Sequence, residues 1–174
     1  MSGSGRRPRR RPDLVSCVGC HALVADTDGL THPYLGASPG CWAIHGEITA
    51  RWASHAAWPL AVDAYAVQHR GVPERRSSQS VWVHLVSLCL IAEHGWSPAM
   101  GIAAKQRLLA HQRRWDWLEP PVDPGPVTIL DLLPLTDPGV FATGVRRWGE
   151  AVWEAWSSHQ PAVRARTQEL LRAS

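Results

Sequence analysis

Apolar residues recur at helical spacing along most of the chain, and they are densest between residues 60 and 90. Their positions there are too closely spaced for a helix that buries only one face. All-round apolarity of this kind is typical of helices at the centre of a small domain. The pattern predicts two such helices, at about 58–69 and 77–93, separated by a turn that contains Gly71 and Pro73.

Three further helices are predicted around this pair. One begins at Cys41, one covers 97–115, and one runs from about residue 138 to the end of the chain, where Pro161 is expected to kink or split it. A short helical turn is expected at 128–131. The sequence therefore predicts an all-α, single-domain bundle of five or six helices, with less than a tenth of the chain in strands.

Composition divides the chain into a leader and a body. Residues 1–12 carry five arginines among Gly, Ser and Pro, and we expect a disordered leader there and one helical domain at 13–174. In the body, 13 of the 18 basic residues remain against 15 acidic ones, which gives a net charge of about −2. An acidic body argues against nucleic acid as a partner, apart from contacts of the leader with phosphates.

The location of the protein is inferred from its apolar runs. The longest run, near 81–92, is shorter than the ~20 residues of a membrane span, and no secretory signal follows the N-terminal arginines. The sequence therefore predicts a cytoplasmic protein without a membrane segment. Its four cysteines are then expected to be reduced, which favours metal binding or buried thiols over disulfides.

Two of the cysteines, Cys17 and Cys20, form a C-x-x-C motif around Gly19. Such a tight turn directs both thiolates at one point, which makes half of a tetrahedral zinc site. With His21 the motif also matches the C-x-x-C-H haem attachment pattern, which would require export. A thioredoxin-like redox pair would require a βαβ unit, and an inert turn with two free thiols is the remaining alternative. Zinc is the favoured interpretation.

The rest of the metal shell is expected where the ends of the helices meet. Cys41 lies in the first turn of its helix, where the helix dipole favours a thiolate. Short connections make successive helices antiparallel, so Cys41, the end of the helix 58–69 and the start of the helix 77–93 lie at one end of the bundle. The loop 30–40 is long enough to bring the C-x-x-C turn onto that end.

Either His69 or His84 could supply the fourth ligand. We assign His84, because it lies in the more apolar run, and predict a zinc site of Cys17, Cys20, Cys41 and His84. The alternative is that both histidines are buried, neutral and hydrogen-bonded to Asp63 or Gln68.

Acid–base residues are expected beside this metal. Glu47, Asp63 and His69 are candidate catalytic residues, since a carboxyl group with a raised pKa beside a histidine suits general acid–base catalysis. A solvent-facing Glu47 is the alternative. The substrate of such a metalloenzyme would be a small molecule that enters through the loop 30–40.

A second hypothesis is a binding or regulatory module without catalysis. A closed zinc site would then only pin the N-terminal segment to the bundle, and the aromatic surface would bind a protein partner or a hydrophobic ligand. The number of protein ligands distinguishes the two, because a closed site has four and an open site has three plus water.

Several motifs occur together in the order C-x-x-C, THPYLGASPGCWAIHGE, VDAYAVQH, QSVWVHLVSLCL and GPVT, followed by a Trp-rich last helix. This combination resembles an uncharacterised bacterial family known only as a domain of unknown function, over roughly residues 15–165. The resemblance implies no activity. It implies a polar signature that consists of Cys17, Cys20, His32, Cys41, Glu47, Asp63, Gln68, His69 and His84.

The sequence departs from this family at two positions. His21 stands where members tend to have Gly, which makes the haem-like match accidental. Trp58 lies near a position where members often have His, so a site that used that histidine would be altered in this chain.

Overall fold

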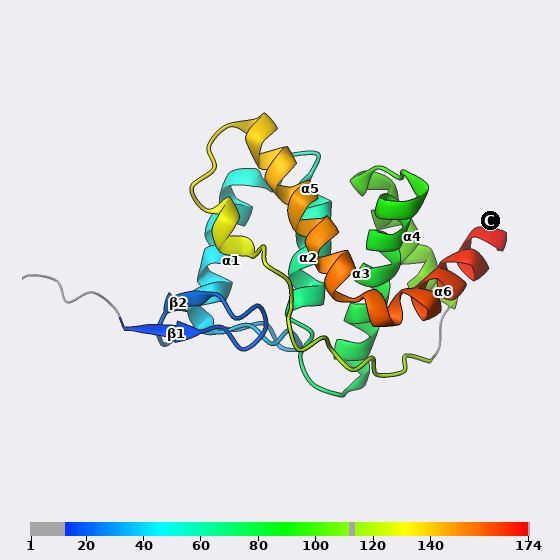
Figure 1. Ribbon diagram of the computed structural model, residues 1–174, viewed down its shortest axis with the longest axis horizontal. Coiled ribbons are helices and arrows are strands. Elements are labelled where there is room, and N and C mark those ends of the chain that lie inside the picture. Colours follow the sequence, from blue (N-terminus) through cyan, green and yellow to red (C-terminus); the bar gives the residue numbers. More distant parts are fainter. Residues whose placement is uncertain (1–12, 112–113, 174) are drawn as a thin grey trace, which may run out of the picture.

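The computed structural model describes residues 13–111 and 114–173, which form six α-helices, two short 3₁₀ turns and one β-hairpin (Figure 1). The elements in chain order are β1 (Leu14–Ser16), β2 (Leu23–Ala25), α1 (Pro39–Trp52), α2 (Trp58–Gln68), α3 (Arg75–His94), α4 (Pro98–His111), η1 (Ile129–Leu132), α5 (Pro138–Ala155), η2 (Ser157–His159) and α6 (Gln160–Arg172). The predicted all-α, single-domain class is confirmed. The predicted disordered leader, residues 1–12, lies outside the described residues.

Helices α2 and α3 form the centre of the domain, as the density of apolar positions predicted. Helix α2 packs against α3 and α5, and α3 packs against α4 and α6. Residues 63–68 of α2 are all buried, so this helix has no exposed face over that stretch. The hairpin and α1 lie at one end of the long axis, and α4 and α6 lie at the other (Figure 1).

The hairpin is the element that the sequence analysis did not predict as strands. Its antiparallel register pairs Leu14 with Ala25 and Ser16 with Leu23. Strands of three residues are too short to give a visible alternation of apolar and polar positions. The hairpin nevertheless presents the C-x-x-C turn to the end of the bundle where α1 begins and α2 ends.

The C-terminal part of the chain folds as two helices rather than one. Helix α5 begins where the Asp137 side chain accepts hydrogen bonds from the backbone N–H groups of Gly139 and Val140, a typical N-cap. It ends before η2, and Pro161 lies in the first turn of α6, where its missing N–H costs no helical bond. No helix in the described part of the chain is long and apolar enough to cross a membrane.

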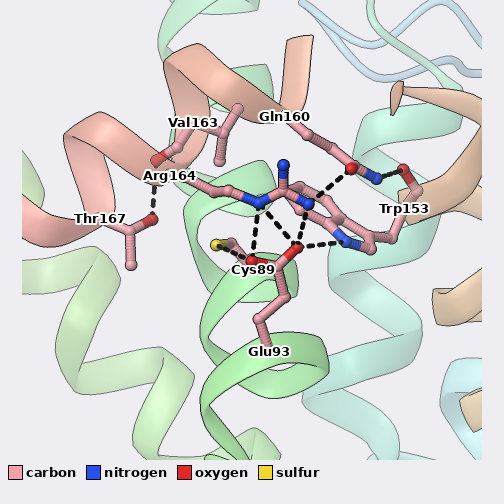
Figure 2. Close-up of polar contacts among 7 residues, drawn as sticks. All are labelled: Cys89, Glu93, Trp153, Gln160, Val163, Arg164 and Thr167. Carbon is pink, nitrogen blue, oxygen red and sulfur yellow. Dashed lines mark hydrogen bonds and ion pairs between the residues drawn. The ribbon is translucent and has the colours of Figure 1, made fainter. Parts of the chain in front are cut away.

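A polar cluster holds α6 on α3 and α5 (Figure 2). The Arg164 guanidinium donates two hydrogen bonds of 2.8 Å to the Glu93 carboxylate, one from Nε to Oε2 and one from Nη2 to Oε1. The indole N–H of Trp153 donates to the same carboxylate at 3.2 Å. Cys89, the fourth cysteine, is buried beside Glu93 and takes no part in the cluster formed by the other three cysteines.

Candidate metal centre

Three cysteines and one histidine converge at the end of the bundle next to the hairpin. The ligand atoms of Cys17, Cys20, Cys41 and His69 all lie within 4.8 Å of one another, and all four side chains are buried. Cys17 and Cys20 come from the β1–β2 turn, Cys41 from the first turn of α1, and His69 from the residue that caps the end of α2. Four such side chains could hold a metal ion.

The hairpin turn is tightly constrained. The Cys17 N–H donates to the carbonyl of Ala22 at 2.8 Å, and the His21 N–H donates to the carbonyl of Cys17 at 3.0 Å. His21 has a φ of 61°, a left-handed conformation that favours glycine. A glycine at this position would adopt the same conformation without steric cost.

Gly19 allows the turn to approach His69. A Cβ atom at this position would lie 2.5 Å from the carbonyl oxygen of Gly36 and 2.5 Å from Cδ2 of His69. Both distances are far below an ordinary van der Waals contact. Only glycine therefore fits between the imidazole and the loop without displacing one of them.

The orientation of the His69 ring is fixed by a backbone carbonyl. Nδ1 lies 2.7 Å from the carbonyl oxygen of Tyr65, which can only accept, so Nδ1 carries the proton and donates. Nε2 is left with its lone pair and lies 3.3 Å from Sγ of Cys41. A histidine that binds a metal through one nitrogen usually donates from the other in this way.

Two further groups support the sulfur atoms. The Ser38 N–H donates to Sγ of Cys17 at 3.5 Å, and the Tyr65 hydroxyl donates to Sγ of Cys41 at 3.7 Å. The Tyr65 ring also stacks on His69 with 3.9 Å between centroids. Tyr65 precedes His69 by four residues, so the two side chains lie on the same side of α2. The sequence indicated no role for Tyr65 at the metal.

Two of the separations between the ligand atoms suit a single tetrahedral ion. With zinc–sulfur bonds of ~2.3 Å, two sulfur ligands lie about 3.8 Å apart, and a sulfur and an imidazole nitrogen lie about 3.6 Å apart. Sγ of Cys20 and Sγ of Cys41 are separated by 3.9 Å, and Sγ of Cys41 and Nε2 of His69 by 3.3 Å. Both separations are close to the tetrahedral values.

The thiols also influence one another's ionisation. Contact with Cys17 raises the pKa of Cys20 to about 11, and it raises the pKa of Cys41 as well. The pKa of Cys17 is lowered, because the thiols of Cys20 and Cys41 donate hydrogen bonds to its sulfur. Three adjacent thiolates therefore require a positive charge between them, which a bound divalent cation would supply.

His84 lies apart from this cluster. The sequence analysis placed His84 with the cysteines and His69 with Asp63, and the structure places the two histidines the other way round. Nδ1 of His84 lies 2.6 Å from Oδ1 of Asp63, which also forms an ion pair with Lys105. The more apolar run did not mark the more buried histidine: His69 is fully buried, whereas the side chain of His84 is partly exposed.

Asp63 is fully buried, and its pKa is lowered rather than raised as the catalytic hypothesis required. Burial alone raises the pKa, but the hydrogen bond and charge of His84 and the charge of Lys105 outweigh it. The Ser87 hydroxyl donates to the second carboxylate oxygen at 2.6 Å. The sequence analysis missed Lys105, although the only lysine in a chain with 17 arginines was a usable signal.

The remaining residues of the expected polar signature lie outside the metal cluster. Glu47 is exposed on α1 and pairs with Arg51 one turn away at 2.8 Å, which is the solvent-facing alternative considered from the sequence. Gln68 is buried and donates to the carbonyls of Pro124 and Val127 at 3.0 and 2.8 Å. Its Oε1 accepts from the Trp148 indole at 3.0 Å, so Gln68 connects α2 to α5 and to the preceding loop.

His45 is separated from His69 by the ring of Tyr65, which contacts both. His32 contacts the rings of Tyr34 and Trp42. His45 stacks on Trp42 with 4.8 Å between centroids and contacts Tyr65 at 4.3 Å. Burial, followed by the charges of His69 and His32, lowers the pKa of His45 to about 4. His45 is therefore neutral near pH 7, and it forms a wall of the cavity described below.

Residues 15–157 match the model of a protein family that is described as a family of unknown function (DUF5946). No curated protein and no solved structure matches the chain.

Proposed function

Since the chain belongs to the family of unknown function DUF5946, we propose its function from the site itself: the protein is a zinc-stabilised binding module, in which the metal is structural. The observation that supports this is the complete set of four buried protein ligands, Cys17, Cys20, Cys41 and His69. A catalytic zinc keeps one position for water or substrate, whereas a structural zinc has four protein ligands. The site belongs to the second kind.

Zinc suits this set of ligands better than other common metals. Magnesium and calcium prefer oxygen ligands, and none of the four side chains offers one. An iron–sulfur cluster is larger than a single ion and needs ligand atoms that are further apart. Three thiolates and one imidazole at tetrahedral spacing are typical of zinc.

The metal would connect three parts of the chain that are separate in the sequence. These are the hairpin, the first turn of α1 and the end of α2. Between the hairpin and α1, residues 26–38 contain no helix or strand, and individual hydrogen bonds hold them, such as the one from the Gly36 N–H to the carbonyl of His69 at 3.0 Å. Zinc binding would contribute directly to folding here, because the ligands come together only in the folded state.

The loop of residues 26–38, held in place by the metal, forms part of the wall of a ligand cavity. Tyr34 lies in this loop, and its carbonyl accepts a hydrogen bond from Ser77 of α3 at 2.9 Å. Tyr34 lines a cavity between α3 and α4, and with His32 it lines a second cavity against α1 and α2. The proposed zinc therefore shapes a binding surface without taking part in chemistry.

Metal analysis of matched variants tests this proposal. Full-length protein purified under reducing conditions is expected to contain close to one zinc per chain by plasma mass spectrometry. Cys17→Ser and His69→Ala should lose the metal, whereas His84→Ala should retain it. Cys89→Ser is the control, because Cys89 is a buried cysteine outside the cluster. Equal zinc content in His69→Ala and wild type would refute the assignment.

A further inference from the structure

A cavity lies between α3 and α4 and is separate from the metal cluster. Its volume is about 460 Å³, within the range of roughly 300–1,000 Å³ that is usual for small-molecule sites. A second cavity of about 160 Å³ adjoins it and reaches toward α1 and α2. The two cavities share Tyr34, Ser80 and His84 in their walls, so His84 lies where they meet.

His84 is held in one tautomer by Asp63. The ionised carboxylate accepts at 2.6 Å from Nδ1, so Nδ1 carries the proton and Nε2 has a free lone pair. Among the described residues, Nε2 has no hydrogen-bond partner. Asp63 is itself fixed by Ser87 and by the ion pair with Lys105. A histidine oriented by a buried carboxylate is the arrangement of a general base.

The wall of the larger cavity is cationic at one end and apolar along its side. Arg76, Ser80 and His84 follow one another at intervals of four residues on α3, so they share a face that extends about 12 Å. Ile102, Lys105 and Leu109 face them from α4. No Asp or Glu of the described chain lines either cavity, and Lys105 is already paired with Asp63.

A second polar group in the adjoining cavity lacks a partner. Nδ1 of His32 is buried and has no hydrogen-bond partner within residues 13–111 and 114–173. The other titratable groups that line this cavity are Tyr34, His45, Tyr65 and His84. A buried nitrogen without a partner is costly, which favours a ligand or water at this point.

We propose that the cavity between α3 and α4 binds a small molecule with an anionic group, an apolar body and an acidic hydroxyl group, and that His84 removes the hydroxyl proton. Arg76 binds the anionic group, and Ile102 and Leu109 contact the apolar body. The O–H bond breaks, the electron pair remains on the ligand oxygen, and the proton forms an N–H bond at Nε2. The resulting imidazolium is stabilised by the Asp63 carboxylate.

The probe (4-hydroxy-3-nitrophenyl)acetate tests this proposal, because its phenol becomes coloured when it loses its proton. At a pH below the ionisation of the free probe, zinc-loaded full-length protein should bind it saturably, and the absorption band of the nitrophenolate should increase. His84→Asn should abolish the band, and Arg76→Gln should weaken binding about tenfold, the effect of one charge-assisted hydrogen bond. The methyl ester of the probe should bind equally weakly to wild type and Arg76→Gln.

The matched controls are His94→Asn and Arg75→Gln, which alter exposed residues of α3 that line neither cavity. Both should bind and colour the probe as wild type does. The proposal is overturned if no saturable binding occurs, if the bound probe stays colourless, or if the band persists in His84→Asn. Zinc content measured on each variant separates failure of this proposal from failure of the metal assignment.

Discussion

Replacing Asp63 by Ala tests the energetics of the buried polar group at the centre of the bundle. Asp63 is fully buried and has three partners: His84, Ser87 and Lys105. Removing one partner of a buried ion pair costs about 3–5 kcal/mol, because the remaining charge stays buried without compensation. For a domain of this size the same change lowers the melting temperature by roughly 6–20 °C.

The assay is urea unfolding of zinc-loaded protein near pH 7, followed by circular dichroism. Lys105→Met is the second variant, and it leaves the carboxylate with His84 and Ser87 only. The double variant should be destabilised by less than the sum of the two single variants, because each single change leaves an unpaired charge that the double change removes. Single-variant costs below about 1 kcal/mol, the average of ordinary substitutions, would refute this reasoning.

The same carboxylate predicts a pH dependence. The pKa of Asp63 is lower in the folded protein than in the unfolded chain. Its contribution to stability is therefore fully present above its unfolded pKa and is lost as the pH falls through the folded value. The stability difference between wild type and Asp63→Ala should be constant near neutrality and should shrink below about pH 4. A difference that does not change in acid would contradict the assigned ion pair.

Three smaller predictions concern single residues. Gln68→Leu should cost about 2–4 kcal/mol by urea unfolding, because it leaves the Trp148 indole and two carbonyls without partners; a neutral effect would show that water replaces the amide. Glu47→Ala should change stability by less than about 0.5 kcal/mol, since its ion pair is exposed, and a larger loss would contradict the solvent-facing position. Gly19→Ala should weaken zinc affinity in a competition with a chelator, because its Cβ would collide with His69; unchanged affinity would mean that the turn can shift freely.

Helical periodicity predicted the fold because the helices are long and their faces are distinct. The last helix was expected to begin near Pro138, and α5 begins there with Asp137 as its cap. Gly95, with a φ of 66°, ends α3 as a left-handed cap. The hairpin could not be predicted in this way, because its strands have only three residues each. They are held by pairing with each other and by packing of β2 against α1. The surface of α1 on which the hairpin packs forms only when the chain folds, so the periodicity of the sequence does not reveal it.

The candidate site could be predicted only in part. The C-x-x-C spacing and the antiparallel order of the helices bring Cys17, Cys20 and Cys41 together, as the sequence analysis expected. The choice between His69 and His84 depended on which way each ring faces. That direction is set for His69 by the carbonyl of Tyr65 and for His84 by Asp63, neither of which periodicity specifies.

The ionisation of Asp63 is another property that helical periodicity does not specify. The apolar run around Asp63 indicated burial, and burial alone would raise the pKa of the carboxyl group. The structure adds Lys105, which lies 42 positions away in the sequence and belongs to another helix. The hydrogen bond and charge of His84, together with the charge of Lys105, reverse the direction of the shift, and only the packing of α2 against α3 and α4 reveals these partners.

We propose that Cys17, Cys20, Cys41 and His69 form a closed zinc site. The most direct measurement is zinc-edge X-ray absorption of the wild-type protein, which reports the elements bonded to the metal and their distances. We predict three sulfur ligands at ~2.3 Å and one imidazole nitrogen at ~2.0 Å, without a water ligand. A shell with an oxygen ligand in place of the imidazole, or the absence of zinc from reduced protein, would contradict the claim.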